Sequence, residues 1–210
     1  MFVFFEIVLF CMPACYPANP PDYMEKLKKQ FETIGFSGDE LNDILQAFTL
    51  KVFAKNDFFT EEGKISRQLG FIEKGLFQYY IIKEGEEKTT YVSIAGTFLS
   101  SVTSFVTETP ARESVRALTT SEVCLITRSD LMNLVQKVPR FKDFYIRLLE
   151  WAISGIDSSR HDLIVLNAEQ RYEKMLYQEP HMLQQIPLQH LASMLGVTPR
   201  HLSRIRKNIR

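Results

Sequence analysis

The residues best suited to chemistry lie in the last segment of the chain, where cationic side chains gather without acidic ones. From His181 to Arg210 there is no Asp or Glu, although the 210 residues together have a formal net charge of zero. Any nucleic-acid surface must therefore arise from this local segregation of charge. The cations of the segment are Arg200, Arg204, Arg206, Lys207 and Arg210.

The sequence LQHLASMLGVTPRHLSRIRK, residues 188–207, predicts a helix, a tight turn and a second helix. Gly196 tolerates a left-handed turn, Thr198 is a good N-cap, and Pro199 suits a first helical position because no hydrogen bond is lost there. Ala192 keeps the first helix thin where the second helix crosses it. The small shared core is expected to contain Leu191, Leu195, Val197, Leu202 and Ile205.

The second of these helices has an outward face that avoids the apolar residues Leu202, Ile205 and Ile209. An exposed helix N-terminus with Arg side chains suits a DNA major groove, where Arg bonds guanine N7 and O6 and other cations hold phosphates. The alternative is an amphipathic helical hairpin with a solvated basic face. The predicted DNA-binding residues are Pro199, Arg200, Ser203, Arg204, Arg206 and Lys207.

The elements before this segment predict an α+β fold. Residues 24–48 have helical spacing broken by Gly35 and Gly38, which favours two short helices. Residues 49–127 contain β-branched and aromatic runs with a glycine every ten to twelve residues in part of the region, typical of a β-roll (jelly roll). Lys83 to Glu87 is expected to form a hairpin tip, and Ser129-Asp130 to cap the next helix.

A long helical stripe follows from Pro139 to Leu166. At about 1.5 Å per residue it reaches roughly 40 Å, long enough to connect domains and to present a seam to the same helix of a second copy. The alternative is that the stripe only covers the β-roll. The stripe therefore predicts a homodimer and leaves that alternative open.

The first residues differ from the rest of the chain. Residues 1–23 combine a short apolar run with prolines, but Glu6 interrupts the run and no positive charge precedes it. We interpret them as a leader of doubtful status, with Met24 opening the working protein and lipoprotein cleavage before Cys15 as the alternative. The interrupted run is too short to span a bilayer, so no membrane association is expected. Three cysteines form a poor disulfide framework, so a reducing cytoplasm is expected.

Residues 53–81, FAKNDFFTEEGKISRQLGFIEKGLFQYYI, with the order of elements that follows, resemble the Crp/Fnr family of transcription regulators over nearly all of residues 24–210. Asn56 stands where a glycine is more usual. The resemblance implies an N-terminal cyclic-nucleotide-binding-like effector domain (24–138), a dimerisation helix (139–166) and a helix-turn-helix domain (167–210). It also implies double-stranded DNA, a second copy and RNA polymerase as partners.

The effector region departs from the cyclic-nucleotide binders of that family. Gly96 is followed by Thr97 instead of Glu, and Ala111 stands where the phosphate-binding Arg is expected, with Arg112 beside it. Each lost charged hydrogen bond is worth about 1.5–3 kcal/mol, so cyclic AMP is disfavoured. The region holds an unknown small-molecule effector or none, and its candidate residues are Gly96, Thr97, Phe98, Leu99, Phe105, Arg112, Glu113 and Ser114.

Other classes of function have less support. The three cysteines are too few for a four-thiolate iron–sulfur sensor, and Cys124 is expected inside a core strand. No phosphate loop, nucleophile elbow or paired metal-ligand motif is present, so we expect no catalytic residues, no metal and no identified cofactor. The competing interpretation is a ligand-binding module that regulates a protein partner without DNA binding.

Overall fold

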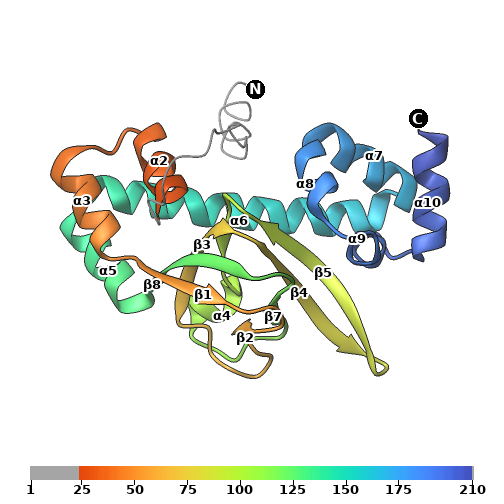
Figure 1. Ribbon diagram of the computed structural model, residues 1–210, viewed down its shortest axis with the longest axis horizontal. Helices are drawn as coiled ribbons and strands as arrows, with labels where there is room; N and C mark the ends of the chain where they lie inside the picture. The colour runs from red at the N-terminus through yellow and green to blue at the C-terminus, as the bar shows by residue number, and fades with distance from the viewer. Residues whose placement is uncertain (1–23, 210) are drawn as a thin grey trace.

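The computed structural model describes residues 24–209, and the predicted leader and Arg210 lie outside them. One long helix, α6 (Pro139–Val165), runs along the molecule (Figure 1). A β-roll lies against its middle, short helices surround its first turns, and a helical domain that ends the chain lies at its other end. No helix within residues 24–209 is long and apolar enough to cross a membrane.

The β-roll consists of two antiparallel sheets of four strands each, with the orders β1-β8-β3-β6 and β2-β7-β4-β5. Aromatic and β-branched residues alternate into the space between the sheets, where Phe53, Phe77 and Val115 are buried. The strands are β1 (Thr49–Phe53), β2 (Phe58–Thr60), β3 (Gln68–Lys74), β4 (Leu76–Lys83), β5 (Glu86–Ile94), β6 (Phe98–Leu99), β7 (Ser114–Ala117) and β8 (Ser121–Thr127). A short helix, α4 (Val102–Thr107), connects β6 to β7.

Left-handed backbone occurs in several turns, and two of them bear on the predictions. The predicted hairpin tip between β4 and β5 is present, with φ of 56° at Glu84 and 79° at Gly85. Two positive φ values in succession are typical of the turn that matches the twist of a hairpin. Asn56 has φ of 75° in the turn between β1 and β2, and Asn is the non-glycine residue that best tolerates this conformation.

A register shift in the β4–β5 hairpin decides which side chains face inward. Tyr79 pairs with Tyr91, but Tyr80 pairs with Thr89, so Thr90 is an extra residue on β5. A bulge of this kind re-aims the side chains on either side of it. Thr89 is buried on the outer side, against the C-terminal helical domain, whereas Tyr79 is buried between the sheets.

Three helices close one end of the roll together with the first turns of α6. They are α2 (Glu25–Thr33), α3 (Gly38–Gln46) and α5 (Arg128–Lys137). Phe31 is central to their core and contacts the rings of Phe36, Phe141 and Phe144. The predicted cap at Ser129-Asp130 was wrong: α5 begins at Arg128, because the Thr127 hydroxyl accepts a hydrogen bond from Asp130 N at 3.1 Å.

Four short helices follow α6 and form a second core. Met182, Leu183, Leu191, Leu202 and Ile205 are buried there. The helices are α7 (Ala168–Gln178), α8 (Pro180–Gln185), α9 (Leu188–Met194) and α10 (Pro199–Asn208). This core continues into the outer side of β5, which packs against α9.

Candidate functional site

The last two helices, α9 and α10, form the predicted helix-turn-helix. Gly196 has φ of 67°, and Val197 N donates back to Ala192 O at 2.9 Å, which closes the turn. The Thr198 hydroxyl accepts from His201 N at 3.2 Å, so Thr198 caps α10 as predicted. Leu202 and Ile205 are buried against α9, so the opposite face of α10 is directed outward.

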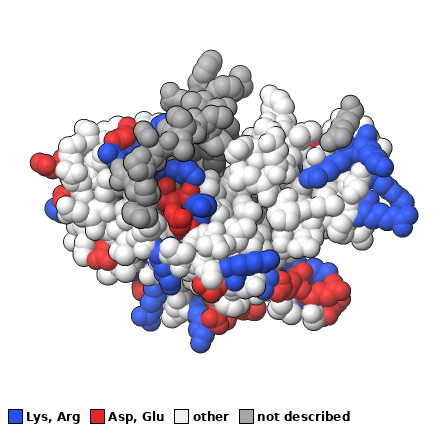
Figure 2. Space-filling view, in the orientation of Figure 1, with Lys and Arg blue, Asp and Glu red and all other residues white. Residues whose placement is uncertain are grey.

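The outward face of α10 carries exposed cations. Arg200, Arg204 and Lys207 are exposed, and Ser203 is partly exposed with its hydroxyl donating to Pro199 O at 2.9 Å. Lys and Arg side chains gather at this end of the molecule, whereas acidic side chains are conspicuous at the hairpin tip (Figure 2). A shallow hollow of about 340 Å³ on this surface is lined by Glu169, Thr198, Arg200, His201, Arg204, Ile205 and Asn208.

Arg206 differs from the other cations predicted to bind DNA. Its guanidinium lies over the ring of Tyr172 in α7, 5.8 Å from the ring centroid. Its Nε is buried without a hydrogen-bond partner, and the residue is only partly exposed. The structure therefore separates Arg206, which packs between helices, from Arg200, Arg204 and Lys207, which face solvent.

Arg171 connects the helix-turn-helix to the end of α6. Its Nη1 donates to Leu166 O at 2.6 Å, and its Nη2 donates to Leu195 O at 2.7 Å. Leu166 follows the last residue of α6, and Leu195 directly precedes the tight turn after α9. One side chain thus ties the turn of the helix-turn-helix to the junction between α6 and α7.

The two halves of α6 have different surroundings. Phe141, Phe144 and Leu148 pack against the core of the roll, as the covering alternative required. Further along the helix, Ile153 is 63% exposed and Leu163 is 61% exposed. The spacing of Ile146, Leu149, Ile153, Ile156, Arg160 and Leu163 is that of the a and d positions of a heptad repeat, with one cation among apolar residues.

The predicted effector residues have different surroundings. Phe98 contacts Phe71 and Phe144, and Leu99 and Phe105 are fully or almost fully buried in core clusters. Gly96 and Thr97 form the turn between β5 and β6, where the Thr97 hydroxyl donates to Ile94 O at 2.8 Å.

The other three predicted residues lie at the start of β7 or just before it. Ser114 accepts from Glu62 N at 3.0 Å, and Glu113 accepts from the Thr90 hydroxyl at 3.0 Å. Burial raises the pKa of Glu113. Arg112 points to solvent, so no cation reaches the interior from this position.

Sequence reasoning missed a tyrosine whose hydroxyl is buried inside the roll. The Tyr79 hydroxyl accepts from Ser100 N at 3.2 Å and lies 3.3 Å from Ser100 O, to which it donates. Tyr79 is 8% exposed, and burial raises its pKa to about 12. Its ring packs edge-on against Tyr91. A phenol therefore pairs with a backbone amide just before α4, in the region assigned to an effector.

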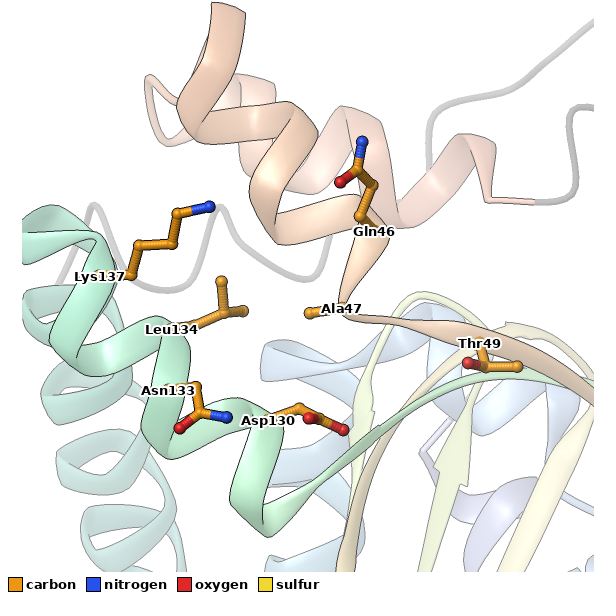
Figure 3. Close-up of a pocket in the computed structure, with 7 residues that line it drawn as sticks. All are labelled: Gln46, Ala47, Thr49, Asp130, Asn133, Leu134 and Lys137. Atoms are coloured by element: carbon orange, nitrogen blue, oxygen red, sulfur yellow. The ribbon is translucent and has the colours of Figure 1, made fainter.

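A second hollow lies outside the predicted effector region. It measures about 310 Å³ and is open to solvent between α5 and the segment from α3 to β1 (Figure 3). It is lined by Gln46, Ala47, Thr49, Asp130, Asn133, Leu134 and Lys137. Lys137 pairs with Asp43 at 2.7 Å, so its charge is already engaged. Within residues 24–209 there is also no cluster of three or more metal-ligating side chains.

Comparison with known proteins agrees with this architecture. Residues 50–138 match the cyclic nucleotide-binding domain family. FixK2 from Bradyrhizobium japonicum superimposes with a TM-score of 0.67 at 14% identity, over 77% of this chain and 84% of its own. A CooA variant from Carboxydothermus hydrogenoformans gives 0.63 at 16% identity, over 79% and 77%. The catabolite activator protein of Thermus thermophilus gives 0.54 at 19% identity, over 83% and 84%.

No curated protein matches the chain in sequence. The structural similarities, all at low identity, establish the fold. They confirm the predicted α+β architecture of a cyclic-nucleotide-binding-like roll, a long helix and a C-terminal helix-turn-helix.

Proposed function

We propose that this chain, which carries a cyclic nucleotide-binding domain and has the fold of Crp/Fnr-type regulators, is a DNA-binding transcription regulator. The observation that carries the proposal is the outward face of α10, where Arg200, Arg204 and Lys207 are exposed beyond a capped N-terminus. Such a helix end can enter the major groove and bond base edges. In this proposal residues 24–138 are the effector domain, 139–166 the dimerisation helix and 167–210 the DNA-binding domain.

The exposed heptad positions of α6 support a parallel homodimer. Two copies related by a two-fold axis present two α10 helices, so we expect a palindromic operator with half-sites about one helical turn apart. RNA polymerase is the expected protein partner of a regulator bound at such a site. A DNA-binding role also requires the compartment that holds the chromosome, which agrees with the expected cytoplasmic location.

The buried Tyr79 supports DNA binding that does not require cyclic AMP. The phenol is buried between the sheets and bonded to Ser100, and the predicted arginine position is Ala111. A signalling nucleotide would have to displace a buried and hydrogen-bonded ring and would find no buried guanidinium contributed by Ala111 or Arg112. We therefore expect equal operator affinity with and without cyclic AMP.

The test of the proposed function is selection from random duplex DNA, followed by fluorescence anisotropy on the selected duplex. We expect Arg204→Ala to weaken binding about five- to a hundredfold, since one good contact between Arg and guanine contributes roughly 1–3 kcal/mol. Lys55→Ala is the matched control, because Lys55 is an exposed cation in the turn between β1 and β2. Its affinity should equal that of the wild type.

Salt dependence separates DNA recognition from a chance basic helix. The logarithm of the binding constant should fall linearly with the logarithm of the salt concentration, because phosphate contacts release cations bound to the DNA. Failure to select any duplex, or equal affinities for Arg204→Ala and wild type, would instead favour the ligand-binding module that acts on a protein partner.

A further inference from the structure

A buried chain of hydrogen bonds crosses the contact between the roll and the helix-turn-helix. Thr89 N on β5 donates to the Ser193 hydroxyl on α9 at 2.9 Å, and the Thr89 hydroxyl lies 3.2 Å from His190 Nδ1. Thr89 is 5% exposed and His190 is 8% exposed. Val92 and Ile94 of β5 belong to the same apolar cluster as Leu191. Two side chains of α9 thus bind one residue of the effector domain inside an otherwise apolar contact.

The donor and the acceptor of each hydrogen bond in this chain follow from the ion pair at its solvent-exposed end. Arg116 on β7 donates to both carboxylate oxygens of Glu87, which can only accept. Arg116 Nη2 also donates to Gln78 Oε1 at 3.0 Å, which fixes the orientation of that amide. Gln78 Nε2 therefore donates to the Thr89 hydroxyl at 2.9 Å. The proton of that hydroxyl is left to point at His190.

His190 Nδ1 must then accept from Thr89, which requires the neutral imidazole with its proton on Nε2. Nε2 lies 3.2 Å from the Gln189 side-chain amide, which accepts this proton when its oxygen is turned toward the ring. A proton on Nδ1 would face the hydroxyl proton of Thr89 and deprive it of its acceptor. The charged groups that face the ring from other elements are Arg116, which lowers the pKa of His190, and Glu87, which raises it by a smaller amount and is paired with Arg116. Burial and Arg116 together lower the pKa of His190, so the docked state binds this proton less readily than an undocked one.

We propose that Thr89 and His190 form a proton-operated latch that holds the helix-turn-helix on the effector domain when His190 is neutral and releases it when His190 is protonated. The sign follows from the lowered pKa. The docking contribution is complete above the ordinary histidine pKa of about 6.5 and is lost as the pH falls below it. Because Arg171 ties the helix-turn-helix to the end of α6, release lets the domain turn about that junction.

The release of the helix-turn-helix does not depend on the proposed function, and only its effect on DNA binding does. The test therefore uses the full chain without DNA. Hydrogen exchange is followed at β5 and α9 between about pH 8 and pH 5, with correction for the intrinsic exchange rate. We expect exchange at Thr89 N and along α9 to rise about tenfold or more at the acid end. Protection of β8, which lies in the other sheet from β5, should be unchanged, which excludes global unfolding.

His190→Asn is the discriminating variant, because an Asn oxygen can take the place of Nδ1 as acceptor and does not titrate in this range. We expect it to keep the protection of β5 and α9 at both ends of the range. Unchanged protection in the wild type across the range, or parallel loss in His190→Asn, would overturn the latch. A switch in exchange without any DNA binding would keep the latch and refute the regulator.

Discussion

The phenol oxygen of Tyr79 lies 3.2 Å from the backbone nitrogen of Ser100, between the two sheets of the roll. The same oxygen lies 3.3 Å from the carbonyl oxygen of Ser100, so one hydroxyl satisfies both polar groups of that residue. Without this phenol, the amide of a residue that is 7% exposed would need water or a ligand as its partner. The roll thus satisfies both backbone groups of Ser100 with one of its own side chains.

Tyr79→Phe tests this relationship. The substitution keeps the ring but leaves the Ser100 amide and carbonyl without their partner, so the free energy of unfolding should fall by about 1–3 kcal/mol. Urea denaturation measures the change. Tyr177→Phe is the control, because that side chain is 91% exposed and loses a hydroxyl already in water. Equal stability of the two variants would contradict the role assigned to Tyr79.

The helix-turn-helix was predictable because its determinants are local. Gly196, Thr198 and Pro199 specify the turn and the first residues of α10 through their own backbone preferences. The wrongly placed cap of α5 has an equally local cause. Thr127, Ser129 and Asp130 are all capping residue types, and strand β8 continues to Thr127, which therefore stands at the first turn.

Tyr79 and His190 could not be assigned from the sequence, because their roles depend on partners far along the chain. Two tyrosines stand side by side in β4, and only the packing of the two sheets decides that Tyr79 faces inward. The extra residue Thr90 likewise turns Thr89 to the outer side of β5, which a regular alternation would not predict. His190 is 101 residues from Thr89, and only the docking of α9 on β5 brings them together. Arg206 was predicted to bind DNA because it is a cation of α10. Its position over the Tyr172 ring depends on the packing of α7, which the local sequence does not specify.

Glu73 provides a prediction of pH dependence at the other end of the roll. It is 8% exposed, and its carboxylate accepts from Lys26 N at 3.1 Å and Leu27 N at 2.8 Å, which anchors the start of α2 to β3. Burial raises the pKa of Glu73 above its ordinary value. The folded state therefore favours protonated Glu73 more than the unfolded state does. The stability that this protonated form contributes is lost as the pH rises through the raised pKa.

Glu73→Gln fixes the side chain in a neutral form and should remove this dependence. The free energy of unfolding of the wild type minus that of the variant should decrease from about pH 4 to pH 7, since only the wild type gains a buried charge. Urea unfolding at several pH values measures the difference. Glu25→Gln is the control at an exposed position in the first turn of α2. A difference that does not change with pH would refute the interpretation.

Arg206 and Lys207 are neighbours in sequence, and the structure predicts opposite effects for them. Arg206→Ala removes the contact with Tyr172 and should lower stability by about 0.5–1 kcal/mol, with little effect on the salt dependence of DNA binding. Lys207→Ala should leave stability unchanged and reduce the salt slope by about one ion. Thermal unfolding and anisotropy titrations measure the two effects. A reduced slope for Arg206→Ala would place that side chain on the DNA.

The exposed half of α6 gives the prediction for assembly. Ile153 and Ile156 are 63% and 57% exposed. In a symmetric dimer along α6, both copies of each residue would be buried in the interface. Ile153→Asp removes roughly 1.5–3 kcal/mol of apolar burial from each copy and places like charges together. The dimer dissociation constant should therefore rise about a hundredfold or more, as measured by sedimentation equilibrium.

The matched control adds the same charge elsewhere on the same helix. Ser154 is exposed one residue away, outside the a and d positions, so Ser154→Asp should remain dimeric. Operator affinity should fall only in Ile153→Asp, because two half-sites are bound together only by a dimer. An Ile153→Asp variant as dimeric as Ser154→Asp would show that the second copy does not bind along this face of α6.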